Sequence, residues 1–169
     1  MHLLNLIKLV VNLIKGLSKE EPKSVPSSSD NKEELTPEFI FNSAYGVYGK
    51  NTVLAHLAIS QAILESALFV NPSKLAREGK NLFGIKGVGT DGSIELLTWE
   101  HIDGEDLKVP AKFAKHKLYA DSFKQHYDLM HKPRYASVLK ASTLEEAARE
   151  VSKAGYATDP KYSTKIINT

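Results

Sequence analysis

Residues 61–69, QAILESALF, place a carboxylate inside an otherwise apolar segment. An ionised side chain on an apolar surface costs free energy unless a partner compensates it. Such surroundings disfavour the charged form, so the pKa of Glu65 should lie above that of a free side chain. A raised carboxyl pKa suits a general acid that works near neutral pH. Glu65 is therefore a candidate catalytic acid, and the alternative is an acid at the end of a core helix that reaches out to solvent.

A second carboxylate is usually required across the bond when a glycosidic bond is hydrolysed. Candidates lie close together in one segment: Glu95, Glu100, Asp103, Glu105 and Asp106. Glu100 is favoured because it follows Trp99, the only tryptophan, at the end of a β-rich run where both side chains can face a cleft. Aromatic faces pack against sugar rings, although a lone tryptophan is more often part of a core.

Other catalytic and metal-binding signatures are absent from the sequence. The chain has no cysteine, which removes disulfides, thiolate ligands and cysteine nucleophiles. Its six histidines show no HExxH or comparable spacing, and neither GxSxG nor GxxxxGK[ST] occurs. We expect no metal and no organic cofactor. The net charge of +2, from 22 Lys and Arg against 20 Asp and Glu, argues against nucleic acid as a partner, because a strongly basic patch would be expected.

The element that must position Glu65 is predicted to be a long buried helix. Asn51 or Thr52 is the predicted N-cap, and the helix is expected to run to about Phe69. Apolar side chains spread around its whole circumference, which is typical of a buried helix. Gln61 and Glu65, four residues apart, form a narrow polar strip along one side.

The remaining elements are predicted to be short helices and one β-hairpin. The β-rich residues 93–114 contain the turn signal Asp103-Gly104, and Pro110 favours an edge strand or a short one. Helices are expected from Thr36 to Gly49, from Ser122 to about Met130, from Ser142 to about Lys153, and from Pro160 to the C-terminus. The expected fold is mainly α with a small β-hairpin lobe.

The N-terminal 35 residues differ in composition from the rest. Residues 1–18 are apolar except at helical spacing, which predicts an amphipathic helix, and their run is shorter than the roughly 18–20 clean residues of a membrane span. The expected partner is a membrane surface, another protein or another copy of the chain. The alternatives are a degenerate export signal and packing onto its own domain. Residues 19–35 have the composition of a flexible linker, so the folded domain is expected over residues 36–169.

Six short motifs follow one another in an order typical of a single enzyme family. They are QAILES, SKLA, NLFGIKG, the T-x-E of residues 98–100 with Asp103-Gly104 behind it, Arg134-Tyr135 and AGYATDPKYSTKI. Together they resemble the family 73 glycoside hydrolases, the bacterial and phage N-acetylglucosaminidases that cut peptidoglycan, including the flagellar-rod and autolysin types. The resemblance covers about residues 37–168.

This resemblance implies a lysozyme-like α+β domain and an endo-β-N-acetylglucosaminidase that hydrolyses the β-1,4 bond after N-acetylglucosamine in peptidoglycan glycan strands. Glu65 falls at the family's essential acid. Glu100 falls at its second carboxylate, on a mobile hairpin over the cleft. The positions implied to bind substrate or to shape the binding loop are Tyr156, Asn81, Phe83, Trp99 and Asp159.

One stretch departs from the family pattern. After the essential acid the family commonly continues Ser-Gly-Trp-Gly, whereas here Ser66 is followed by Ala67-Leu68-Phe69. Loss of the glycines and the aromatic residue is expected to reshape one wall of the cleft and to affect substrate preference.

Rival hypotheses remain for the activity and the mechanism. The chain could instead be a lytic transglycosylase or a muramidase of the same superfamily, or a catalytically silent wall-binding or structural module of a phage or flagellar assembly. A hydrolase could act by inversion, by retention or with the help of the substrate's own acetamido group. Action at the cell wall or periplasm is expected because peptidoglycan lies outside the cytoplasmic membrane, and the short layout favours a phage-encoded or virion-associated bacteriolytic enzyme such as an endolysin.

Overall fold

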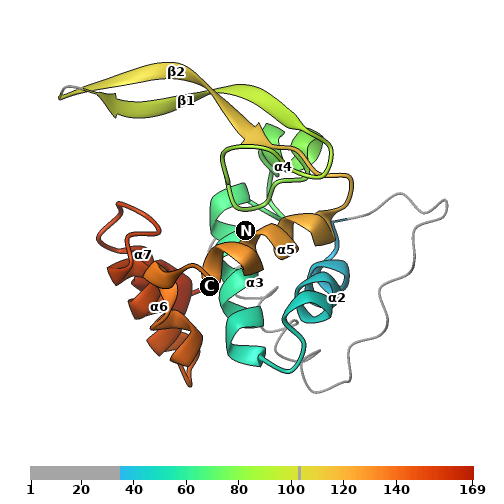
Figure 1. Cartoon of the computed structure of the whole chain (residues 1–169), viewed down its shortest axis with the longest axis vertical. Helices are drawn as coiled ribbons and strands as arrows, with labels where there is room; N and C mark the ends of the chain where they lie inside the picture. The colour runs from blue at the N-terminus through green and yellow to red at the C-terminus, as the bar shows by residue number, and fades with distance from the viewer. Residues whose placement is uncertain (1–34, 103) are drawn as a thin grey trace.

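Figure 1 shows the computed structural model of the chain, which describes residues 35–102 and 104–169. Within them a helical body carries a two-stranded antiparallel sheet, so the predicted mainly-α fold with a β-hairpin lobe is confirmed. No helix in this part of the chain is long and apolar enough to cross a membrane. The predicted helix of residues 1–18 lies outside the described residues, as does the predicted linker up to residue 34.

The helical body is built around α3 (Thr52–Ser66), with α2 (Pro37–Tyr48) and α5 (Tyr119–Met130) to one side and α6 (Leu144–Lys153) and α7 (Tyr162–Ile167) to the other (Figure 1). The Asn51 side chain accepts a hydrogen bond from the Leu54 amide at 3.1 Å, which confirms the predicted N-cap. Most side chains of α3 are buried around its whole circumference, as the pattern predicts.

The C-terminal end of α3 differs from the prediction, because the helix stops at Ser66 rather than near Phe69. Ala67 and Phe69 both adopt left-handed backbone conformations, with φ of 52° and 70°. These are the two positions at which the family resemblance leads us to expect glycine. Leu68 is completely buried, and Phe69 packs against the core. The chain therefore makes a glycine-like turn without glycine, and apolar packing holds it in place.

The hairpin consists of β1 (Ser93–Ile102) and β2 (Glu105–Ala114) and projects away from the helical body (Figure 1). Ile102 pairs with Glu105, so the turn has two residues at the predicted place. Gly104 has φ of 87°, which a glycine adopts without strain, and Asp103 lies outside the described residues. Pro110 is tolerated opposite Leu97 because both strands of a two-stranded sheet are edges.

The hairpin is attached to the body at its base. The Asn81 side-chain amide donates to the carbonyl oxygen of Ala114, the last residue of β2, at 2.9 Å. The short helix α4 (Lys74–Gly79) packs against the start of β1, and a Cβ atom added to Gly79 would lie only 3.2 Å from Ile94 Cγ2. Both contacts hold the base of the hairpin rather than its tip.

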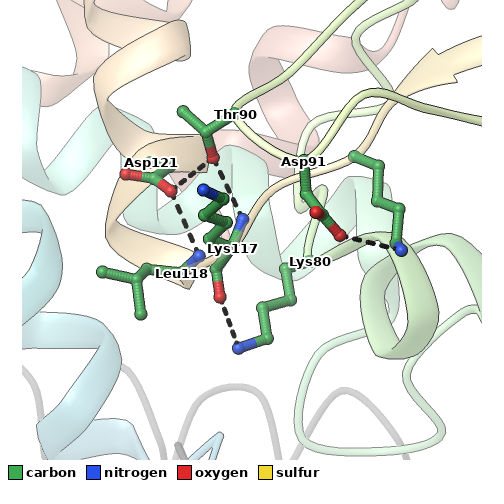
Figure 2. A network of polar contacts seen from close by, with 7 residues as sticks. Lys80, Thr90, Asp91, Lys117, Leu118 and Asp121 are labelled. Atoms are coloured by element: carbon green, nitrogen blue, oxygen red, sulfur yellow. Dashed lines mark hydrogen bonds and ion pairs between the residues drawn. The ribbon is translucent and has the colours of Figure 1, made fainter. Parts of the chain in front are cut away.

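A polar network joins the loop before β1 to the start of α5 (Figure 2). The Asp121 carboxylate accepts from the Leu118 amide at 3.1 Å and from the Thr90 hydroxyl at 2.6 Å. Thr90 in turn accepts from the Lys117 amide at 3.0 Å, and the Lys80 ammonium donates to the Lys117 carbonyl at 2.7 Å. Because Asp121 caps the helix from its first turn, α5 begins at Tyr119, three residues before the predicted start.

The two C-terminal helices follow the prediction closely. Thr143 caps α6 by accepting from the Glu146 amide at 3.1 Å, and the helix ends at the predicted Lys153. The last helix, α7, begins at Tyr162, two residues after the predicted start at Pro160.

Candidate active site

Glu65 lies in the last turn of α3 and borders an open hollow of about 670 Å³. Its Oε1 atom accepts a hydrogen bond of 2.6 Å from the hydroxyl of Tyr162 on α7. The hollow is lined by one acid, several aromatic and aliphatic side chains and two cationic residues: Glu65, Phe83, Gly84, Ile85, Lys86, Leu129, Arg134, Tyr135, Tyr156, Ala157 and Thr158. The arrangement can present a proton to a ligand that fills the hollow.

The pKa of Glu65 is raised from its ordinary 4.5, as the sequence predicts. Desolvation by the surrounding protein is the largest cause, and the Tyr162 hydrogen bond and the Lys165 charge oppose it. Glu65 as a residue is nevertheless exposed. Both facts hold because the walls of the hollow surround the carboxyl group while its mouth stays open to solvent. A ligand that closes the mouth would desolvate Glu65 further.

Tyr156 lies in the wall of this hollow, where the sequence resemblance led us to expect a cleft tyrosine. Its ring stacks on that of Tyr162, with centroids 5.8 Å apart. Its hydroxyl oxygen is buried without a hydrogen-bond partner among the described residues, and burial raises the pKa of the hydroxyl. A buried hydroxyl without a partner is costly.

The loop that carries Tyr156 is held by Arg134. The guanidinium donates to the carbonyl oxygens of Ala154 and Gly155, the latter at 2.9 Å. Gly155 has φ of 71° and approaches Arg134 so closely that a Cβ atom would lie 3.1 Å from its Nη2 atom. The motif Arg134-Tyr135 thus acts on the site by fixing the backbone of the GYATDP loop.

Asn81 and Phe83 divide the two roles predicted for the NLFGIKG loop. Asn81 is only 1% exposed, and its Oδ1 atom accepts from the amides of Phe83 and Ile85, both at 3.2 Å. Because its amide nitrogen is also used, towards Ile85 and Ala114, Asn81 shapes the loop and has no group left for a ligand. Phe83 lines the hollow and stacks on His126 with centroids 4.2 Å apart.

Trp99 and Glu100 border a neighbouring hollow of about 700 Å³, together with Asp106 and Thr158. Thr158 lines both hollows, so the two adjoin. Glu100 forms an ion pair with Lys86, which lines the hollow of Glu65. The Trp99 ring is 67% exposed, so most of its surface is open to solvent.

Asp159 does not line either hollow, although the resemblance suggested substrate contact or loop shaping. Its carboxylate pairs with Lys165 at 2.5 Å and accepts from the Lys161 amide at 2.8 Å, which lowers its pKa. Its carbonyl oxygen accepts from the Tyr162 amide at 3.0 Å. Asp159 therefore starts α7 and holds Lys165, whose charge acts on Glu65.

Residues 67–69 also lie outside the lining of both hollows. The prediction that the departure from Ser-Gly-Trp-Gly reshapes a wall of the cleft is therefore not met by these side chains. Tyr162, in contrast, was missed as a site residue. It lies inside the recognised motif AGYATDPKYSTKI, but no local pattern indicates that its hydroxyl meets Glu65, 97 residues away.

Residues 35–102 and 104–169 contain no group of three or more His, Asp or Glu side chains placed to hold a metal ion. The described lining of the hollow of Glu65 presents a carboxyl group, tyrosine side chains and cationic side chains.

Comparisons with known proteins identify several similar chains. The family model named Glucosaminidase, described as mannosyl-glycoprotein endo-beta-N-acetylglucosaminidase, matches residues 42–169. Exo-glucosaminidase LytG of Bacillus subtilis is 33% identical over 89% of this chain and 55% of its own length. Peptidoglycan hydrolase FlgJ of Escherichia coli K12 is 38% identical over 67% of this chain and 38% of its own length.

A solved structure, the catalytic domain of the autolysin Auto from Listeria monocytogenes, superposes with a TM-score of 0.65 and 25% identity. The match covers 94% of this chain and 90% of that one. The chain thus spans about half or less of the length of the two curated relatives, and nearly the whole of a solved catalytic domain.

Proposed function

Because the chain belongs to the glucosaminidase family, we propose that it is a peptidoglycan hydrolase that cleaves the β-1,4 bond after N-acetylglucosamine, with Glu65 as general acid. The observation that carries the proposal is the Glu65 carboxyl group in the hollow, partly desolvated and hydrogen-bonded to Tyr162. The relatives indicate the substrate class, since they are a glucosaminidase and a peptidoglycan hydrolase.

Glu65 acts by giving its proton to the glycosidic oxygen as the bond to the departing sugar breaks. Partial desolvation keeps a share of Glu65 protonated at a pH where a free glutamic acid would be ionised. After the transfer, the Tyr162 hydroxyl donates its hydrogen bond to the new carboxylate. Desolvation thus favours the protonated state of Glu65, and the Tyr162 hydroxyl stabilises the carboxylate that forms.

Glu100 acts as the second carboxylate, from the hairpin. Its present partner is Lys86, and both side chains are substantially exposed, so this ion pair is weak in solvent and easily exchanged. Because the hairpin is held at its base, movement of the tip changes the separation of Glu100 and Glu65. A separation of about 6.5–9.5 Å leaves room for a water and gives inversion, whereas about 5–5.5 Å allows a covalent intermediate.

Substrate is held by aromatic side chains. Phe83 and Tyr156 line the hollow of Glu65, where their rings can pack on a sugar. Trp99 offers an exposed ring at the neighbouring hollow, where a further sugar of the glycan strand can pack.

The acid is tested with Glu65→Gln, which keeps the shape and removes the proton. We expect this variant to fold and to lose clearance of purified cell wall by at least about a hundredfold. The matched control is Glu95→Gln, at an exposed carboxylate of β1 that lines neither hollow, and this variant should clear wall at the wild-type rate. Undiminished clearance by Glu65→Gln would eliminate the assignment.

The bond is identified by mass spectrometry of the ends released from purified wall. New reducing N-acetylglucosamine ends support the proposal. Anhydromuramic ends would indicate a lytic transglycosylase, muramic acid reducing ends a muramidase, and intact strands a silent wall-binding or structural module. Proton NMR of the first anomer released then separates inversion from retention. A substrate-assisted mechanism also retains the configuration and gives the same anomer as a covalent enzyme intermediate.

The site of action follows from the substrate. Peptidoglycan lies outside the cytoplasmic membrane, so the enzyme works in the periplasm or at the wall. The association with a phage or a virion stays a prediction, and so does the partner of the N-terminal residues 1–18.

A further inference from the structure

A row of buried polar side chains leads from Glu65 through the helical body. The Tyr162 hydroxyl lies 2.6 Å from Glu65 Oε1, and Gln61 Nε2 lies 3.2 Å from the Tyr162 hydroxyl. Gln61 Oε1 lies 3.1 Å from His126 Nε2, and His126 Nδ1 lies 2.6 Å from the Tyr48 hydroxyl. The row therefore joins α7, α3, α5 and α2. Gln61 and Glu65, the polar strip noted in the sequence, are the central member and one end of this row.

The chemistry of His126 sets the direction of these hydrogen bonds. His126 is completely buried, and burial lowers its pKa to about 3, so the ring is neutral at the pH of activity. A neutral imidazole has one donor and one acceptor nitrogen. Gln61 Oε1 can only accept, so Nε2 carries the proton and Nδ1 accepts from Tyr48. This tautomer follows from the network of partners.

At the other end, Gln61 controls what the Tyr162 hydroxyl can do. The Gln61 amide nitrogen donates to the hydroxyl oxygen, and the single proton of that hydroxyl is then donated to Glu65. Without the donation from Gln61, the hydroxyl could turn and accept a hydrogen bond from protonated Glu65 instead. Each donor in the row thus points towards the carboxyl group, and hydrogen bonds in such a chain strengthen one another.

We propose that Gln61, oriented by His126 and Tyr48, is a positioning residue that keeps the Tyr162 hydroxyl a donor to Glu65. The inference rests on the proposed role of Glu65. When the O–H bond of Glu65 breaks and the glycosidic oxygen takes the proton, the carboxylate left behind meets a donor that is already aimed at it. Preorganised donors of this kind stabilise charge that develops in the transition state.

Gln61 is uncharged, so replacing it changes no formal charge in the site. The ionisable groups that face Glu65, from α7, the loop before it and the rest of the hollow, are Tyr162, Lys165, Tyr156, Tyr135, Arg134 and Lys86.

The test replaces Gln61 by methionine, which has a similar shape and no strong hydrogen-bonding group. We expect kcat on purified glycan strands to fall about tenfold, with KM within about twofold of wild type. The limb of the pH profile that reports the protonated acid should move to higher pH, because the carboxylate loses its donor. The matched control is Ile63→Met, at a buried position of the same helix outside the row, which should leave both the pH limb and kcat unchanged.

A second readout does not need turnover. The Glu65 carboxyl carbon can be followed by NMR in protein labelled at glutamate and assigned with Glu65→Gln. A higher titration midpoint in Gln61→Met than in wild type and Ile63→Met supports the proposal, and an unchanged midpoint overturns it. If the midpoint rises but wild-type protein releases no new ends from wall, the proposed function fails while the positioning role stands.

The far end of the row supplies a milder variant in case Gln61→Met does not fold. Tyr48→Phe removes only the hydroxyl that donates to His126 Nδ1, and a smaller rise of the same midpoint is expected. Nitrogen NMR of His126 in wild type should show the proton on Nε2. A proton on Nδ1 would reverse the row and overturn the proposal.

Discussion

Replacing Ala67 by glycine should stabilise the protein, because the backbone there has a conformation that suits glycine. Ala67 caps α3 with φ of 52° and ψ of 34°, directly after the turn that carries Glu65. The left-handed conformation costs an L-residue about 1–2 kcal/mol. Glycine has more conformational freedom in the unfolded chain, which lowers the stability of the folded protein by about 0.4–1 kcal/mol. Since the Ala67 methyl is exposed, little packing is lost, and a net gain of about 0.5–1 kcal/mol is expected.

The assay is urea unfolding at constant pH, with thermal unfolding as a second probe. The gain corresponds to a rise of about 1–4 °C in Tm for a chain of this size. Two comparison variants sharpen the result. Phe69→Gly relieves the same strain but loses a ring packed on the core, so it should be less stable than wild type. Ala62→Gly, inside α3, should lose about 1 kcal/mol or more.

A loss of stability in Ala67→Gly would refute this reasoning. It would mean that the left-handed turn is unstrained, and that the glycines of the family pattern have some other purpose. A gain in both Ala67→Gly and Phe69→Gly would instead show that packing of Phe69 contributes less than the strain of its backbone.

Other expected outcomes concern the acid, the hairpin and the N-terminal residues. Because burial raises the pKa of Glu65, the fold disfavours its ionised form, and wild type loses stability as the pH rises from below 4.5 through the folded-state pKa. In urea unfolding, Glu65→Gln should therefore be as stable as wild type at pH 4 and more stable than wild type at pH 7. Equal stability of the two proteins at both pH values would contradict the desolvation of Glu65. Trp99→Ala should raise KM about threefold to tenfold without changing Tm, since the ring is exposed, and an unchanged KM would remove Trp99 from the substrate site. A truncated chain that begins at Glu34 should keep its activity on purified wall, because every residue that lines the two hollows follows residue 36. Loss of activity in this truncated chain would make residues 1–33 part of the catalytic unit.

Local elements of this protein were predictable because local interactions decide them. Thr36 and Asn51 each cap a helix by accepting an amide hydrogen bond from a residue three positions on, and such contacts are written in neighbouring residues. The hairpin turn at Asp103-Gly104 follows the same logic, because the turn needs a residue that tolerates positive φ. The raised pKa of Glu65 was predictable because apolar surroundings disfavour an ionised carboxylate.

The tertiary structure decided what those side chains meet. The Tyr162 donor to Glu65 and the row through Gln61 and His126 join residues up to 101 positions apart, and such meetings depend on how the helices pack. Packing also left Glu65 facing an open hollow and enclosed Asn81 completely. The sequence alone determined that an acid lies on a central helix beside a β-hairpin. Its partners and its solvent exposure followed only from the packing of distant segments, because hydrogen bonding and desolvation depend on distances in space.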